Sequence, residues 1–210
     1  MTPSSPSAGR KRIRLKPEIR AQQILDAALA EFSQHGFAAA RIEDIAARAG
    51  LSKSGVYAHY AGKDEIFEAL LMEVLSPHGS PEGAWEPEPD MPLPALVESY
   101  IEALYGRLQD PTVQATFRLL IAESERAPVL IRRWHAQTAE RRERDQAFVD
   151  DCVRRGVMRA SALTERFTLA AAPAVMWMNM YVALKEDVPL SLAQARDAHA
   201  RLLMDVLQPR

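Results

Sequence analysis

Small polar and basic side chains gather between residues 52 and 63 of this 210-residue sequence. Hydroxyl, ammonium and imidazole groups can bind phosphate oxygens and base edges, and small side chains let a helix enter a major groove. The residues with this potential are Ser52, Lys53, Ser54, Gly55, Tyr57, His59, Tyr60 and Lys63. Two alternatives to nucleic-acid contact remain open from composition alone. In the first, the residues are ordinary exposed residues of a short helix; in the second, the tyrosines pack inward.

The spacing of apolar residues predicts how this segment is positioned. Ile42, Ile45 and Ala46 lie on one face of a short helix that ends at Gly50. Ser52 is a preferred N-cap residue for another helix that runs to about His59. Two short helices joined by a Gly-Leu-Ser turn are typical of a helix-turn-helix, in which the second helix reads the groove.

The distribution of charge agrees with a nucleic-acid partner for the first quarter of the chain. The net charge of the whole chain is −2. Residues 1–63 hold 10 Lys and Arg against 5 Asp and Glu, a net of +5, and residues 64–210 hold 16 against 23, a net of −7. The basic run from Arg10 to Lys16 either follows DNA phosphates or serves only as a solubilising tail.

Residues 40–63, after the helix end His35-Gly36-Phe37, resemble the DNA-binding domain of the tetracycline-repressor (TetR) family. The similarity is carried by Ile45-Ala46, Ala49-Gly50, Ser52-Lys53, Gly55-Val56-Tyr57, His59-Tyr60 and Lys63, and it extends over about residues 18–70. Where the family often has a capping Thr, this sequence has Ala40, so Arg41 takes its place as a candidate phosphate contact. The family more often has Phe at Tyr60.

The resemblance implies a homodimer that binds a near-palindromic double-stranded DNA operator. It also implies a C-terminal domain that dimerises through its last two helices and holds a small-molecule effector, hydrophobic or aromatic, that releases the DNA. Candidate effector residues are Tyr100, Tyr105, Phe117, Trp134, His135, Met176, Trp177 and Met180. Met176 and Met180 share one helix face and Trp177 and Tyr181 another, so one face could line the cavity and the other the dimer interface.

Helical periodicity continues along the rest of the chain, and no segment shows β-alternation. We predict an all-α fold of about nine helices, including single helices from Pro128 to Arg155 and from Thr164 to Leu184, and a proline-rich loop over 76–94 that contains Trp85. The predicted domains are a disordered basic arm at 1–16, a helix-turn-helix domain at 17–63, and a ligand-binding and dimerisation domain at 64–210.

The sequence argues against several other classes of protein. The single cysteine, Cys152, excludes an intrachain disulfide and multi-cysteine zinc sites, and no phosphate-binding glycine loop, His-Glu-x-x-His run or Gly-x-Ser-x-Gly elbow is present. We therefore expect no enzyme activity, metal or cofactor. No apolar stretch is expected to span a membrane. The use of a single cysteine fits a reducing compartment, which predicts a cytoplasmic protein. The alternative function is a helical small-molecule-binding protein that does not bind operator DNA.

Overall fold

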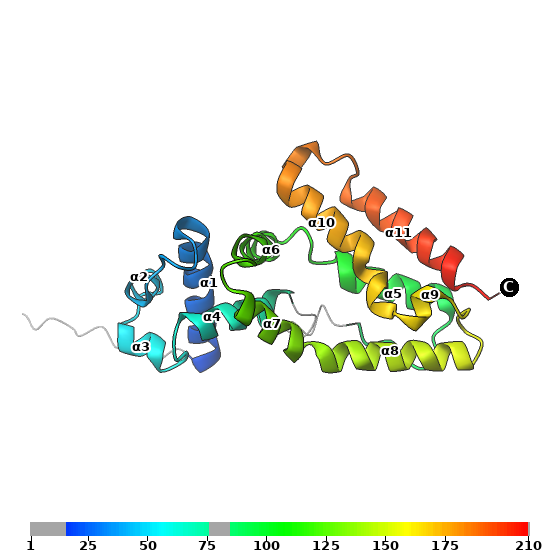
Figure 1. Cartoon of the computed structure of the whole chain (residues 1–210), viewed down its shortest axis with the longest axis horizontal. Helices are drawn as coiled ribbons and strands as arrows, with labels where there is room; N and C mark the ends of the chain where they lie inside the picture. Colours follow the sequence, from blue (N-terminus) through cyan, green and yellow to red (C-terminus); the bar gives the residue numbers. More distant parts are fainter. Residues whose placement is uncertain (1–15, 76–84, 210) are drawn as a thin grey trace, which may run out of the picture.

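The computed structural model describes residues 16–75 and 85–209, and in these two ranges the chain forms helices and no strand. The N-terminal part, at the left of Figure 1, consists of α1 (Pro17–His35), α2 (Ile42–Arg48), α3 (Lys53–Tyr57) and α4 (Lys63–Leu70). A π-helical turn, η1 (Leu71–Leu75), continues α4. This all-α architecture confirms the predicted fold class.

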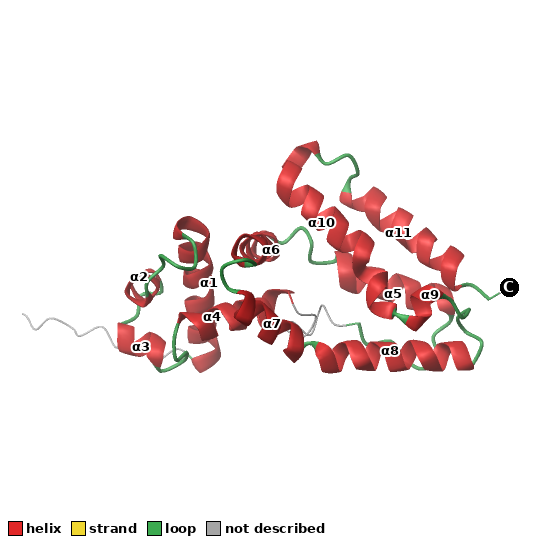
Figure 2. Cartoon of the chain, viewed as in Figure 1, coloured by secondary structure: helices red, strands yellow, loops and turns green. Residues whose placement is uncertain are grey.

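The helices after residue 85 form the larger part of the molecule, and Figure 2 shows helices joined by short loops. They are α5 (Leu93–Tyr105), α6 (Pro111–Glu123), α7 (Pro128–Gln137), α8 (Ala139–Arg154), α9 (Ala162–Glu165), α10 (Ala172–Leu184) and α11 (Leu192–Leu207). The 3₁₀ turns η3 (Phe167–Ala171) and η4 (Lys185–Asp187) flank α10. Helices α10 and α11 pack on each other, and α11 packs along α5 (Figure 1).

Two predicted helices are each divided, so the described residues contain eleven α-helices rather than about nine. The predicted helix 128–155 breaks at Thr138, where the hydroxyl donates to the His135 carbonyl and accepts from the Arg142 guanidinium. A side chain that bonds the backbone in this way competes with the helical pattern. The predicted helix 164–184 breaks at Arg166, whose φ of −140° and ψ of 66° are not helical.

Two hydrophobic cores hold these helices together. The first core joins α1–α4 to the middle helices, because Leu119, Ala127 and Leu130 pack with side chains such as Phe32 and Phe67. The second lies among α5, α8, α10 and α11. The helix-turn-helix is thus fixed to α6 and α7 by buried apolar contacts and does not hang from a free linker.

Trp85 closes one side of the second core. It is 5% exposed, its ring lies at 5.0–5.4 Å from the rings of Tyr100, Phe148 and Phe167, and its Nε1 donates to Ser99 Oγ. The predicted loop therefore contains a core residue. Residues 76–84 of that loop, like the arm at 1–15, lie outside the described residues.

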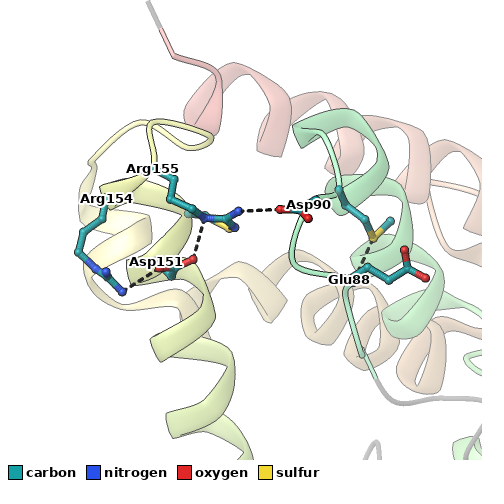
Figure 3. A network of polar contacts seen from close by, with 7 residues as sticks. Glu88, Asp90, Asp151, Arg154 and Arg155 are labelled. Atoms are coloured by element: carbon teal, nitrogen blue, oxygen red, sulfur yellow. Dashed lines mark hydrogen bonds and ion pairs between the residues drawn. The ribbon is translucent and has the colours of Figure 1, made fainter.

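A network of ion pairs fastens the loop that precedes α5 to the C-terminal end of α8 (Figure 3). Arg155 Nη1 lies 3.5 Å from Asp90 Oδ1, and its Nε lies 2.7 Å from Asp151 Oδ2. Arg154 Nη2 lies 2.9 Å from Asp151 Oδ1. Gly156, with a φ of +73°, then ends the helix.

One described stretch has the length and composition to cross a membrane, contrary to our expectation from the sequence. It is Phe167–Leu184, whose mean hydropathy is 1.4 over 18 residues and of which 28% is buried. A helix from a protein core or interface passes the same test, so this is weak evidence for a membrane segment. The stretch includes η3, so only its second part is α-helical.

We predict that Trp85→Ala lowers the free energy of unfolding by about 3–5 kcal/mol, because it removes a buried indole from between three aromatic rings. Val129→Ala is the control, since Val129 is 49% exposed and Ala favours the helix, and we expect a change within about 0.5 kcal/mol. Urea denaturation followed by circular dichroism measures both. Equal midpoints for the two variants would show that Trp85 is not part of the core.

Candidate DNA interface and effector cavity

The turn between α2 and α3 has the geometry that its sequence predicts. Gly50 has a φ of +65°, and Leu51 N donates to the Ala46 carbonyl at 2.8 Å, which closes the turn. Ser52 caps α3, since its Oγ accepts from Gly55 N at 3.1 Å. Val56 is fully buried, so the opposite face of α3 is turned outward.

The outward face of α3 carries polar side chains that are accessible to a large partner. Tyr57 is 47% exposed, and Ser52, Lys53 and Ser54 are exposed as well. Lys53 Nζ lies 2.5 Å from Glu43 Oε1 on α2. This hydrogen bond lowers the pKa of the Glu43 carboxyl and raises the pKa of Lys53, so both groups are charged at neutral pH.

The remaining candidate DNA contacts differ in their exposure to solvent. Arg41 is exposed at the N-cap of α2, and its side chain makes no capping bond. His59 and Gly55 are half-buried. Tyr60 is also half-buried and packs against the first core, and burial raises the pKa of its hydroxyl. The aromatic body of Tyr60 is therefore a core contact.

The Lys63 ammonium group is hydrogen-bonded to backbone carbonyls of the protein. Its Nζ donates to the carbonyls of Phe37 and Ala38 at 2.8 Å and of Ala40 at 3.4 Å, and it lies 4.9 Å from the centroid of the Phe37 ring. An ammonium group has three donors, and all three have partners here. In this conformation Lys63 holds the turn before α2 and has no donor left for a phosphate.

A second contact joins the same turn to α6. Glu123 is 2% exposed, and its Oε1 accepts from Phe37 N at 3.2 Å. Phe37 follows Gly36, whose φ of 77° and ψ of 155° are accessible essentially to glycine alone. The turn that orients α2 is thus fixed from α4 by Lys63 and from α6 by Glu123.

A cavity of about 230 Å³ lies where these elements meet the rest of the chain. Its wall includes Val74 and Leu75 of η1, Phe117 of α6, Trp134 of α7 and Met178 of α10. The described lining is apolar except for Arg107. A π-helical turn is a rare element that often accompanies a functional site, and here it forms part of the cavity wall.

Comparison with known proteins agrees with this geometry. Residues 24–70 match the family model described as bacterial regulatory proteins, tetR family. Residues 24–70 therefore form a DNA-binding domain of the TetR family. It is 47% identical over 55 residues to the transcriptional repressor SCO4008 of Streptomyces coelicolor, a match that covers 26% of this chain but only 29% of that repressor. The similarity to this relative is thus confined to about a quarter of this chain.

Solved structures share the fold over almost the whole chain. A TetR-family regulator from Pseudomonas syringae aligns with a TM-score of 0.71 and 19% identity, over 92% of this chain and 98% of that one. The complex of SmeT with triclosan aligns with a TM-score of 0.71 and 21% identity, over 90% and 92% of the two chains. At these identities the likeness establishes the fold and not the ligand.

The candidate effector residues of this chain separate into four groups, three of which line cavities. Phe117 and Trp134 line the 230 Å³ cavity, and Tyr100 lines a neighbouring cavity of about 140 Å³. Tyr105, Met176, Trp177 and Met180 line a hollow of about 150 Å³ at α10 and α11. His135 is exposed, lines none of the three, and its carbonyl accepts from Arg142.

Sequence reasoning missed the apolar residues of the cavity wall. Val74, Leu75 and Met178 fit an ordinary helical stripe, and a stripe indicates burial without indicating which neighbours leave a space. Glu43 and Glu123 were missed too, because their partners lie on other elements, α3 for Glu43 and the turn before α2 for Glu123. Among the described residues no cluster of three His, Cys, Asp or Glu side chains could hold a metal ion, and burial raises the pKa of the Cys152 thiol.

Lys63 and Lys53 offer a matched test of these assignments. We predict that Lys63→Ala lowers the free energy of unfolding by about 1–3 kcal/mol, because three backbone carbonyls lose a charged donor. Lys53→Ala removes only an exposed ion pair, so its unfolding midpoint stays unchanged. Thermal and urea denaturation measure both; a stable Lys63→Ala variant would contradict the structural role.

Proposed function

We propose that this chain is a ligand-responsive transcriptional regulator, a repressor, that binds a near-palindromic operator as a homodimer and is released by a small molecule. The observation that carries the proposal is the exposed polar face of α3, held on a core that extends to the cavity wall. This role places the protein in the cytoplasm. The related proteins are transcriptional regulators, and we propose no enzyme activity for this chain.

In this proposal α3 is the recognition helix in the major groove. Tyr57, Ser54 and Ser52 offer hydroxyl donors and acceptors from its outward face, and Gly55 and His59 border them. Lys53 leaves Glu43 and binds a phosphate, and Arg41 binds the backbone from the start of α2. Exchange of one exposed ion partner for another costs little, since such a pair contributes little to stability.

The charge distribution supports the same orientation. Residues 1–63 have a net charge of +5, and the remainder has −7. A field of this kind attracts the N-terminal part to DNA and keeps the acidic part away from it. The basic residues before α1 would add affinity that depends on salt more than on sequence.

The proposed dimer interface is the outer face of α10 and α11. Met176 and Leu184 of α10 and Leu202 of α11 are 46–55% exposed, although α10 is almost wholly apolar. A helix of that composition is normally covered by another surface. The hollow beside Met176 and Leu202 would receive a side chain of the second copy.

The proposed effector site is the 230 Å³ cavity, because two elements of its wall also contact the turn of the DNA-binding part that precedes α2. Leu75 continues from α4, whose first residue, Lys63, holds the turn before α2. Phe117 belongs to α6, which carries Glu123 to the same turn. A ligand that displaces η1 or α6 would therefore change the orientation of α2 and α3, and allosteric coupling typically amounts to about 1–3 kcal/mol.

The first test is a mobility-shift assay with the DNA immediately upstream of the chain's own gene. We expect a sequence-selective shift that weakens with salt. Tyr57→Ala and Lys53→Ala should each weaken it about tenfold, and Lys53→Ala should also reduce the slope of log affinity against log salt by about 1.

The matched control is Arg118→Ala, since Arg118 is exposed on α6 and outside the proposed interface. It should bind the DNA as the unmodified chain does. If neither recognition-helix variant is impaired, α3 does not read the operator. If the chain binds small molecules and no DNA at any salt concentration, the alternative of a helical binding protein is correct.

The second test concerns the dimer. Leu202→Glu and Met176→Glu should each give a monomer in analytical ultracentrifugation, because a carboxylate would be buried without a partner. Val129→Glu is the control, as Val129 has a similar exposure of 49% on α7. A dimer that survives both α10–α11 changes would exclude this face as the interface.

A further inference from the structure

A second cavity, of about 140 Å³, lies beside the 230 Å³ cavity and differs from it in chemistry. Its wall combines three aromatic side chains, Trp85, Tyr100 and Phe167, with the charged residues Arg141, Arg142 and Asp145. Ala103 and Leu104 of α5 line both cavities. The two spaces therefore share one small apolar stretch of α5 as a common border.

Arg141 is the unusual member of this wall. It is 7% exposed, and arginine is almost never buried unless it is paired. Its Nε lies 2.8 Å from Asp145 Oδ1, and its Nη1 lies 3.9 Å from the exposed Glu86 carboxylate. Its Nη2 is buried and donates to no atom of the part of the chain that the structure describes.

A buried donor without an acceptor calls for an explanation, because leaving it unpaired costs free energy that folding must supply. A ligand oxygen is such an explanation where the donor borders a cavity. The neighbouring Arg142 does not compete for this role, since its guanidinium already donates to Thr138 Oγ1 and to the His135 carbonyl. Burial, assisted by the Asp145 carboxylate, raises the pKa of Tyr100, so its hydroxyl stays protonated beside the site.

We propose that the two cavities together bind an amphipathic monocarboxylic acid, with its carboxylate on Arg141 and its apolar body reaching past Ala103 and Leu104 into the larger cavity. The inference rests on the proposed role of that cavity as the effector site. A guanidinium presents parallel donors that suit a carboxylate. A dianion such as a phosphate ester is disfavoured, because Asp145 already occupies one side of the guanidinium.

The sizes of the cavities limit the acid. A cavity of about 150 Å³ holds a benzene ring, so the smaller space takes a carboxylate with a few carbons or one ring. The larger space, lined by Phe117, Trp134 and Met178, takes the remainder of an alkyl chain or a second ring. This describes a medium-chain or aryl-substituted acid.

The experiment compares sodium decanoate with decan-1-ol and decylamine, which have the same chain and a neutral or cationic head. Binding to the full-length, DNA-free protein is measured by calorimetry. We expect decanoate to bind at least about tenfold more tightly than either comparator, as a charge-assisted hydrogen bond would give. Equal or weaker binding of decanoate would overturn the proposal without any variant.

Variants then locate the carboxylate. Arg141→Lys keeps the charge opposite Asp145 but loses the forked donors, so decanoate should bind about tenfold more weakly while decan-1-ol is unaffected. Arg118→Gln, on the exposed face of α6, is the matched control and should change neither. The proposal is wrong if Arg141→Lys binds decanoate as tightly as the unmodified chain does. It is also wrong if Arg107→Gln is the variant that loses affinity for decanoate, because the carboxylate then does not lie on Arg141.

The outcome is separable from that of the proposed function. Operator binding is measured by mobility shift with and without decanoate. A chain that binds its operator but no acid overturns this inference alone. A chain that binds decanoate through Arg141, with no effect on DNA binding, supports the acid site and overturns the proposal that ligand binding there releases the operator.

Discussion

The segment Lys63–Leu75 is attached at both of its ends. The helix-turn-helix and the cavity both depend on this constraint. At its start, the Lys63 ammonium bonds three carbonyls of the turn before α2. Along its length, Ile66, Phe67 and Leu70 are buried in the core shared with α1. At its end, Leu75 lines the cavity. Because packed interiors are stiff, this segment cannot move at one end without a response at the other.

Buried charges lie where separate helices must keep a fixed relation. Glu31 of α1 holds Arg48 of α2 at 2.7 Å, and Glu123 of α6 accepts from the turn between those helices. Such groups cost desolvation energy, so they are weak evidence for stability, but their geometry allows few alternative arrangements. Apolar contacts supply the cohesion of the N-terminal part, and these polar contacts restrict the angle at which α2 and α3 are presented.

Helix starts are predictable from sequence, as the start of α3 at Ser52 was, because capping is a local property. Asp110 accepts from Thr112 N, and Ser191 forms a capping box with Gln194, both within three residues. The break at Thr138 was not predicted, since the type of residue at Arg142 does not by itself indicate that its side chain bonds the Thr138 hydroxyl four residues earlier. The engagement of Lys63 was equally hidden, because its acceptors lie 23–26 residues away. The residue types on the exposed face of α3 could be predicted from the sequence. The position and the lining of the cavity could not.

Helix α10 connects the two proposals that concern the C-terminal part. Ala174, Val175 and Met178 face the 230 Å³ cavity, whereas Met176, Trp177 and Met180 border the hollow on the outer face. One helix thus supplies a wall to the effector site and a surface to the second copy. Any displacement of α10 that improves contact with a ligand alters the surface offered to the partner. By linkage, the free energies of dimerisation and of ligand binding must then depend on each other.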